Sequence, residues 1–148
     1  VEQVRADLHS GIFYLGHSPA IKKVLTPMEN LSWFCASSGA GHQESISKAL
    51  AVFGLKGYDD IPCYMMSAGQ QRRVSLARLL LSSAKLWILD EPFTALDKKG
   101  VGELEVFLAE HVNGGGAVIL TTHHHLQMPC EVKVLNLDGL AWDTGVQS

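Results

Sequence analysis

Three short apolar runs constrain the fold of this chain more than any other feature. They are residues 12–15, 86–89 and 117–120. Continuous apolar runs of this length are typical of strands that are covered on both faces, as in parallel sheets. The stretch 98–111 is helical in character and is followed by three glycines, so the second and third runs predict a βαβ unit. The sequence therefore predicts an α/β fold with a mainly parallel sheet.

The residues that follow these runs are candidates for chemistry. His17 follows the first run, Asp90 and Glu91 follow the second, and His123 follows the third. Ligands of open parallel sheets bind beyond the carboxyl ends of the strands. We therefore expect these four side chains at one site.

Residues 26–81 are predicted to be mainly helical. Thr26, a proline and Glu29 form a capping-box start for a helix that runs to about residue 36. A second helix is expected over 43–53, and Ser67 can cap a third. The expected packing face of the third helix is Val74, Leu76, Ala77, Leu80 and Leu81.

The end of the chain predicts a hairpin. Residues 132–143 surround an Asp138-Gly139 pair, which favours a tight turn between two strands. Such a hairpin would close one edge of the sheet.

Charge and composition narrow the functional class. Twelve basic and fifteen acidic residues give a net charge of −3, which argues against sequence-independent binding of nucleic acid. No apolar run approaches the roughly 18 residues that a membrane-spanning helix needs. The three cysteines form no CxxC pair, so reduced, cytoplasmic thiols are expected. The basic pairs Lys22-Lys23, Arg72-Arg73 and Lys98-Lys99 are interpreted as solvated surface charge; the alternative is that one pair helps dock a partner.

Four segments resemble, in order, the motifs of ABC-type ATPases. Residues 67–73 resemble the signature, 86–92 the Walker B strand, 95–97 the D-loop, and His123 the switch histidine. The order and the separations are those of the family. The resemblance implies a partial P-loop NTPase fold of the ABC ATPase type.

The same resemblance implies a domain organisation. Residues 1–148 would form one ABC ATPase domain that is incomplete at its N-terminus. Within it, 26–81 would be the helical subdomain and 82–148 the Walker B half of the core.

The acidic pair after the second run has two interpretations. As in the Walker B motif, Asp90 would bind Mg²⁺ and Glu91 would polarise the water that attacks ATP. The alternative is that the two carboxylates only cap a turn. The surrounding motifs favour the catalytic interpretation.

The signature-like segment begins a helix, whose free amides and positive dipole end suit a polyphosphate. The resemblance implies that Ser67, Ala68, Gly69 and Gln70 face an ATP held by the opposite subunit of a homodimer. Asp97 would meet that subunit through the D-loop, and it is also suited to cap the following helix.

The histidines carry separate expectations. His123 could contact the γ-phosphate of ATP or could simply be solvated in a polar loop; its position after a strand favours the phosphate contact. His17 stands where most ABC ATPases have glutamine, and a neutral imidazole there could accept a contact from water or bind magnesium; a structural loop role is the alternative. We do not expect metal binding by the run formed with His124 and His125, because neighbouring residues on an extended backbone cannot all face one ion.

The amino-acid sequences of several segments resemble those of one particular family, the ATP-binding subunit of the cytochrome c maturation haem exporter. The segments are 14–22, 25–31, 67–73 and 84–94. The resemblance implies a subunit on the cytoplasmic face of the bacterial inner membrane that docks on an integral-membrane haem-export permease. It would couple ATP hydrolysis to haem delivery, with no nucleic acid as partner.

One motif of that family is absent from these 148 residues, which contain no GxxxxGK[ST] phosphate loop. The segment 38–42 resembles one faintly but lacks the lysine. We therefore expect the chain to be a fragment that does not by itself bind ATP tightly or hydrolyse it. The alternatives are an ABC transporter with a different cargo, a soluble ABC-type ATPase that acts on nucleic acid, and a non-catalytic remnant.

Overall fold

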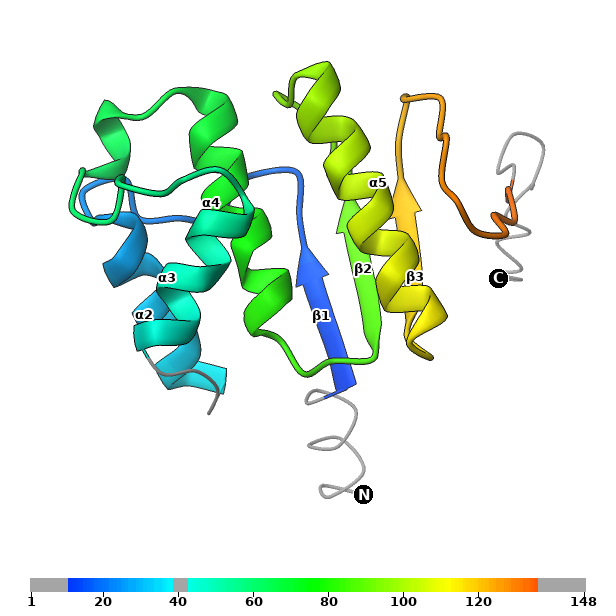
Figure 1. Cartoon of the computed structure of the whole chain (residues 1–148), viewed down its shortest axis with the longest axis horizontal. Coiled ribbons are helices and arrows are strands. Elements are labelled where there is room, and N and C mark those ends of the chain that lie inside the picture. The colour runs from blue at the N-terminus through cyan, green and yellow to red at the C-terminus, as the bar shows by residue number, and fades with distance from the viewer. Residues whose placement is uncertain (1–10, 39–42, 136–148) are drawn as a thin grey trace, which may run out of the picture.

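The computed structural model describes residues 11–38 and 43–135 of the chain. A three-stranded sheet lies beside a group of helices, and a further helix crosses the sheet (Figure 1). The elements, in chain order, are β1 (Ile12–Leu15), α2 (Pro27–Ser38), α3 (Gln43–Val52), a 3-10 turn (Cys63–Met65), α4 (Ala68–Leu81), β2 (Leu86–Asp90), α5 (Lys98–Asn113) and β3 (Ala117–Thr121).

The sheet has the order β1-β2-β3, and both pairings are parallel. This confirms the strands predicted from the three apolar runs. Leu15 is paired with Leu89, and Leu89 with Leu120, so the three carboxyl ends lie at the same edge. β2 and β3 each extend one residue further, which pairs Asp90 with Thr121.

The described helices cover only one face of this sheet. Phe13 and Trp87 point into the core on the covered face, where they are 6% and 3% exposed. On the other face Tyr14 and Ile119 are 66% and 59% exposed. Coverage on both faces, which the continuous apolar runs predicted, is therefore not present among the described residues.

Three helices begin at side-chain caps. At α2 the Thr26 amide donates to Glu29 Oε2 at 2.8 Å and the Glu29 amide to Thr26 Oγ1 at 3.2 Å, which is the predicted capping box. Ser67 and Gln70 form the same reciprocal pair at α4. Asp97 caps α5 by accepting from the Gly100 amide at 2.9 Å.

Helix α4 joins two hydrophobic cores. Its residues Leu76 and Leu79 pack into the core beneath the sheet, whereas Val74 and Ala77 pack against α2 and α3. Leu80, which the sequence placed on the packing face, is 39% exposed. It lies seven residues, two helical turns, after Arg73, on the strip between the two packed faces.

The chain after β3 runs as an irregular segment. Residues 122–135 contain no helix or strand, so the first four residues of the hairpin predicted over 132–143 are not in a strand. The rest of that prediction and most of the segment 38–42 lie outside the described residues. In the parts of the chain that the structure describes, no helix is both long and apolar enough to cross a membrane.

The double role of α4 generates a stability prediction. Leu76→Ala should lower the free energy of unfolding by about 2–5 kcal/mol, because it removes a fully buried side chain between helix and sheet. Leu80→Ala, on the exposed strip of the same helix, should cost less than about 1 kcal/mol. Urea denaturation followed by circular dichroism measures both, and equal losses would contradict the assignment of α4 as the shared core helix.

Candidate functional site

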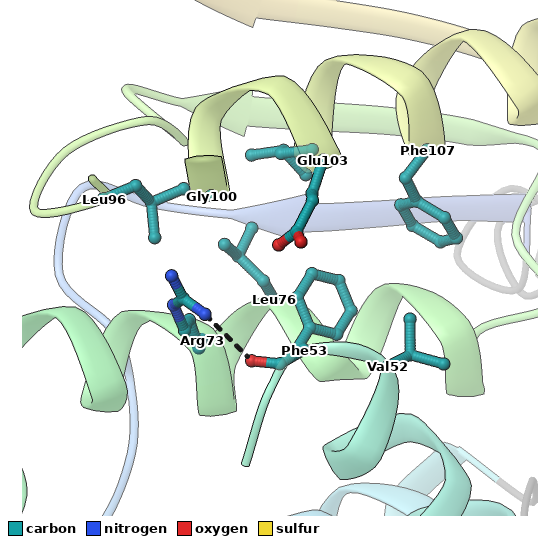
Figure 2. A pocket seen from close by; sticks show the side chains of 9 residues that line it. Val52, Phe53, Arg73, Leu76, Leu96, Gly100, Glu103 and Phe107 are labelled. Atoms are coloured by element: carbon teal, nitrogen blue, oxygen red, sulfur yellow. Dashed lines mark hydrogen bonds between the residues drawn. The ribbon is translucent and has the colours of Figure 1, made fainter. Parts of the chain in front are cut away.

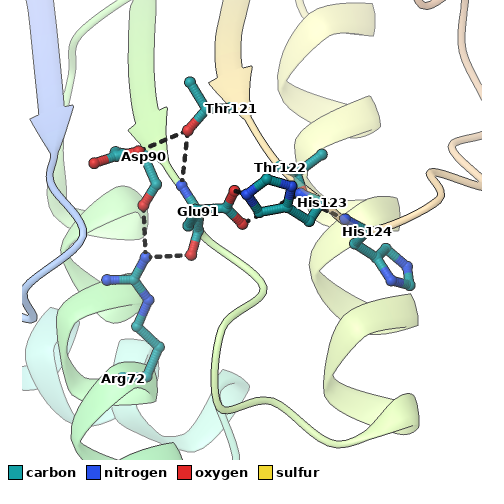
Figure 3. A network of polar contacts seen from close by, with 7 residues as sticks. All are labelled: Arg72, Asp90, Glu91, Thr121, Thr122, His123 and His124. Carbon is teal, nitrogen blue, oxygen red and sulfur yellow. Dashed lines mark hydrogen bonds and ion pairs between the residues drawn. The ribbon is translucent and has the colours of Figure 1, made fainter.

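The candidate site lies where β2 and β3 end side by side. The Thr121 hydroxyl donates to Asp90 Oδ1 at 2.6 Å and accepts from the Glu91 amide at 3.2 Å (Figure 3). Asp90 and Thr121 are paired in the sheet, so both side chains leave the same face. Thr121, which sequence reasoning did not single out, therefore holds Asp90 in place.

Glu91 has a constrained backbone. Its φ is +46°, in the left-handed region that side-chain-bearing residues rarely adopt. Its amide also donates to the Thr121 carbonyl at 3.1 Å, and its own carbonyl accepts from Arg72 at 2.8 Å. Strained positions of this kind persist only where the surroundings fix them, and they are common at functional sites.

The carboxylate of Glu91 meets His123. The His123 amide lies 3.4 Å from Glu91 Oε2, and the ring Nε2 lies 3.5 Å from Oε1. The Glu91 side chain is 21% exposed and that of His123 is 99% exposed. The structure thus brings the two predicted catalytic residues together, with the histidine on the solvent side, while the ring of His124 is turned away from Glu91 (Figure 3).

The burial of Arg72 contradicts a prediction made from the sequence. The pair Arg72-Arg73 was interpreted as solvated surface charge, but Arg72 is 2% exposed. Its position four residues before Leu76 places it on the sheet-facing side of α4, a helical spacing that could have identified it. Its guanidinium donates to the carbonyls of Gly16 (3.1 Å), His17 (3.2 Å), Asp90 (3.0 Å), Glu91 (2.8 Å) and Pro92 (3.4 Å).

The charge of Arg72 also belongs to the site. Burial lowers the pKa of Arg72, and the nearby carboxylates of Asp90 and Glu91 oppose that shift. A buried cation therefore lies beside the backbone that carries the two carboxylates. The interaction reaches from helix α4 to the ends of both β1 and β2.

The signature-like segment forms the start of α4. Ser67 and Ala68 are exposed, while the amides of Ser67 and Gln70 are taken up by the capping box. A Cβ added at Gly69 would lie 2.6 Å from the carbonyl oxygen of Ala95. Glycine therefore permits close approach of the helix start to the loop that precedes α5.

Asp97 in that loop has the capping role that the sequence allowed. Its Oδ1 accepts from the Gly100 amide and from Arg73 Nη2, both at 2.9 Å. The Gly100 amide first, and then Arg73, lower the pKa of Asp97. Arg73, the second member of the basic pair, is thus paired as well and ties α4 to α5.

His17 is exposed and lies at the end of β1, at the same sheet edge as Asp90. Its carbonyl is held by Arg72, so its backbone is linked to the site. The role of its ring stays a prediction.

The donor set fits a magnesium ion that is bound mainly through a nucleotide. The described residues contain no group of three or more histidines, cysteines or acids that could hold a metal. Mg²⁺ usually uses one or two carboxylates and completes its shell with water and phosphate oxygens. Asp90, whose carboxylate is anchored by the Thr121 hydroxyl, could supply the one protein carboxylate that such a site uses.

A cavity elsewhere carries no comparable chemistry. It lies between the end of α3, α4 and α5 and is lined by Phe53, Leu76, Phe107 and other mainly apolar side chains (Figure 2). Arg73 borders it and lies 3.4 Å from the Phe53 carbonyl. It is a packing space beside the Arg73–Asp97 ion pair.

Comparison with known proteins extends these observations. Residues 2–94 match the sequence pattern of the ABC transporter family. The chain is 52% identical, over 93% of its length, to the cytochrome c biogenesis ATP-binding export protein CcmA of Pseudomonas fluorescens, of which it covers 65%. It is 51% identical, over 95% of its length, to the protein of the same name from Hahella chejuensis, of which it covers 67%.

A solved structure shows the same fold. A dimeric ATP-binding cassette in a post-hydrolysis state, bound to ADP and phosphate, matches with a TM-score of 0.72 at 21% identity, covering 84% of this chain and 57% of that one. The chain spans about two thirds of the length of the curated relatives named above. By its sequence match and its fold, the chain belongs to the ABC transporter family.

Proposed function

We propose that the full-length protein is the ATP-hydrolysing subunit of a membrane exporter that serves cytochrome c biogenesis. The observation that carries this proposal is the contact of Glu91 with His123, beside a hydroxyl-anchored Asp90, at the ends of two parallel strands. The CcmA relatives support the biological context.

Glu91 is suited to be the general base. Its carboxylate is partly shielded from solvent, and its backbone is fixed on both sides. A carboxylate held in this way can orient a water molecule for in-line attack on the γ-phosphorus and accept its proton. His123, whose Nε2 lies 3.5 Å from Glu91 Oε1, would contact the γ-phosphate, and the attacking water would lie between that phosphate and Glu91.

Asp90 would be the magnesium ligand. Bound Mg²⁺ neutralises charge on the phosphates of ATP. Thr121 fixes one oxygen of Asp90 through a 2.6 Å hydrogen bond, so the carboxylate keeps one orientation. His17, at the end of the neighbouring strand, is proposed to complete the nucleotide site.

The start of α4 would bind a second nucleotide. Ser67, Ala68, Gly69 and Gln70 offer exposed or half-exposed backbone and a positive helix end, which favour an anionic phosphate. The proposed homodimer places this segment against the ATP of the partner subunit. Asp97 follows two residues after Ala95, whose carbonyl lies close to Gly69, so it would join the same interface.

The proposed cargo and partner rest on the sequence resemblance to the haem exporter and on the export role in cytochrome c biogenesis that the relatives' names give, and not on the site. We propose haem as cargo and an integral-membrane haem-export permease as partner, at the cytoplasmic face of the bacterial inner membrane. A different cargo would leave the geometry of Glu91 and His123 unchanged. Haem-dependent stimulation of ATPase activity in the reconstituted exporter would test this part.

The role of Glu91 can be tested directly. Glu91→Gln in the full-length protein should reduce ATP turnover by about 10²–10⁴-fold while ATP still binds, because the amide cannot take a proton from water. Turnover is measured as phosphate release and binding by calorimetry. The control is Glu103→Gln, a change of an exposed carboxylate on α5. Near-normal turnover of Glu91→Gln would rule out the general-base assignment.

The hydroxyl of Thr121 makes a separate prediction. Thr121→Val should weaken Mg²⁺ binding in the nucleotide complex by about 10–100-fold, the usual effect of losing a group that orients a metal ligand. Thr121→Ser keeps the hydroxyl and should bind normally. Mn²⁺ titration followed by electron paramagnetic resonance measures both affinities. If the valine and serine variants bind Mn²⁺ equally, the hydrogen bond to Asp90 has no role in metal binding.

A further inference from the structure

Glu105 is a buried carboxylate that the proposed reaction does not use. It lies on α5 between Leu104 and the core residue Leu108, and only 6% of the residue is exposed. Burial of a carboxylate is costly unless it is paired or hydrogen-bonded. Its partners therefore indicate what this position does.

Both described partners of Glu105 come from the segment after β3. The Gln127 amide donates to Glu105 Oε1 at 2.7 Å, a short bond of the kind that ionised acceptors form. The His124 ring Nε2 lies 3.8 Å from the same oxygen, close enough for an ion pair when the ring is protonated. The His124 ring also packs against Phe93, at 5.3 Å between ring centres.

This segment needs such an attachment. It contains no helix or strand, and it carries His123, whose side chain is 99% exposed and has little packing to fix it. The approach of His123 to Glu91 therefore depends on the path of the backbone on either side. On one side β3 ends at Thr121, and on the other Glu105 holds Gln127.

We propose that Glu105 is a positioning residue that clasps residues 124–127 to α5 and thereby keeps His123 against Glu91. The hydrogen bond from the Gln127 amide is the main contact that holds the segment, and the approach of the His124 ring to the same carboxylate is the second. The link to hydrolysis rests on the proposed function, whereas the clasp itself is testable without nucleotide.

The experiment uses the full-length protein with Glu105→Met, which keeps the length of the side chain but removes the acceptor. In nucleotide-free protein, amide hydrogen exchange over residues 123–127 should become roughly 10- to 100-fold faster, the scale expected for loss of a hydrogen bond to a charged group. In turnover assays kcat should fall by a similar factor, and KM for ATP should change little.

Three matched variants separate positioning from general destabilisation. Glu105→Gln retains an oxygen that can accept from the Gln127 amide, so it should recover most of the protection and of kcat. Gln127→Pro removes the donor from an exposed position outside the core and should reproduce the effect of Glu105→Met, even if that variant folds poorly. Glu110→Met, at an exposed site on the same helix, should behave as the unaltered protein.

The outcomes are distinct. Unchanged exchange over 123–127 in both Glu105→Met and Gln127→Pro would overturn the clasp. Faster exchange with an unchanged kcat would overturn its role in placing His123. Failure of the unaltered protein to hydrolyse ATP would instead refute the proposed function, and the exchange data would still decide whether the clasp exists.

Discussion

The buried guanidinium of Arg72 is the interaction on which the arrangement of the site depends. Carbonyl groups at the ends of parallel strands lose their ladder partners and need donors when they are buried. Arg72 supplies donors to the ends of both β1 and β2 from within helix α4. Ser67 caps the start of α4, and Arg72 lies five residues further along the chain. One side chain of this helix is therefore bonded directly to the backbone of Glu91.

Contacts with α4 also explain how the protein tolerates backbone strain in the loop that follows β2. Glu91 and Ala95 have φ values of +46° and +64°, each of which costs on the order of 1–3 kcal/mol. The hydrogen bonds of Glu91 with Arg72 and Thr121 offset that cost at the first position. At the second, the Ala95 carbonyl faces Gly69, where any side chain would collide with it. The loop between β2 and α5 is thus bonded to α4 at its first bend and lies close against the helix start at its second.

Periodic and local patterns could be predicted from the sequence, whereas long-range polar contacts could not. The strands and the caps at Thr26, Ser67 and Asp97 follow from short-range rules, and the structure has them where expected. The burial of Arg72 was missed because two adjacent arginines suggest a solvated surface, although helical spacing from Leu76 indicates the sheet-facing side. Nothing local in the sequence distinguishes Glu105 from other acids of α5, because its partner Gln127 is 22 residues away.

The register of β2 and β3 finally determines whether the site forms. Leu89 and Leu120 are paired and point into the core, so their neighbours Asp90 and Thr121 are paired and point to the opposite face. A slip of one residue would turn β3 over, so that Ile119 and Thr121 would replace Val118 and Leu120 on the core face. Burial of the Thr121 hydroxyl among apolar side chains would be costly, which favours the observed register. In that register the Thr121 hydroxyl lies opposite Asp90 and bonds it at 2.6 Å.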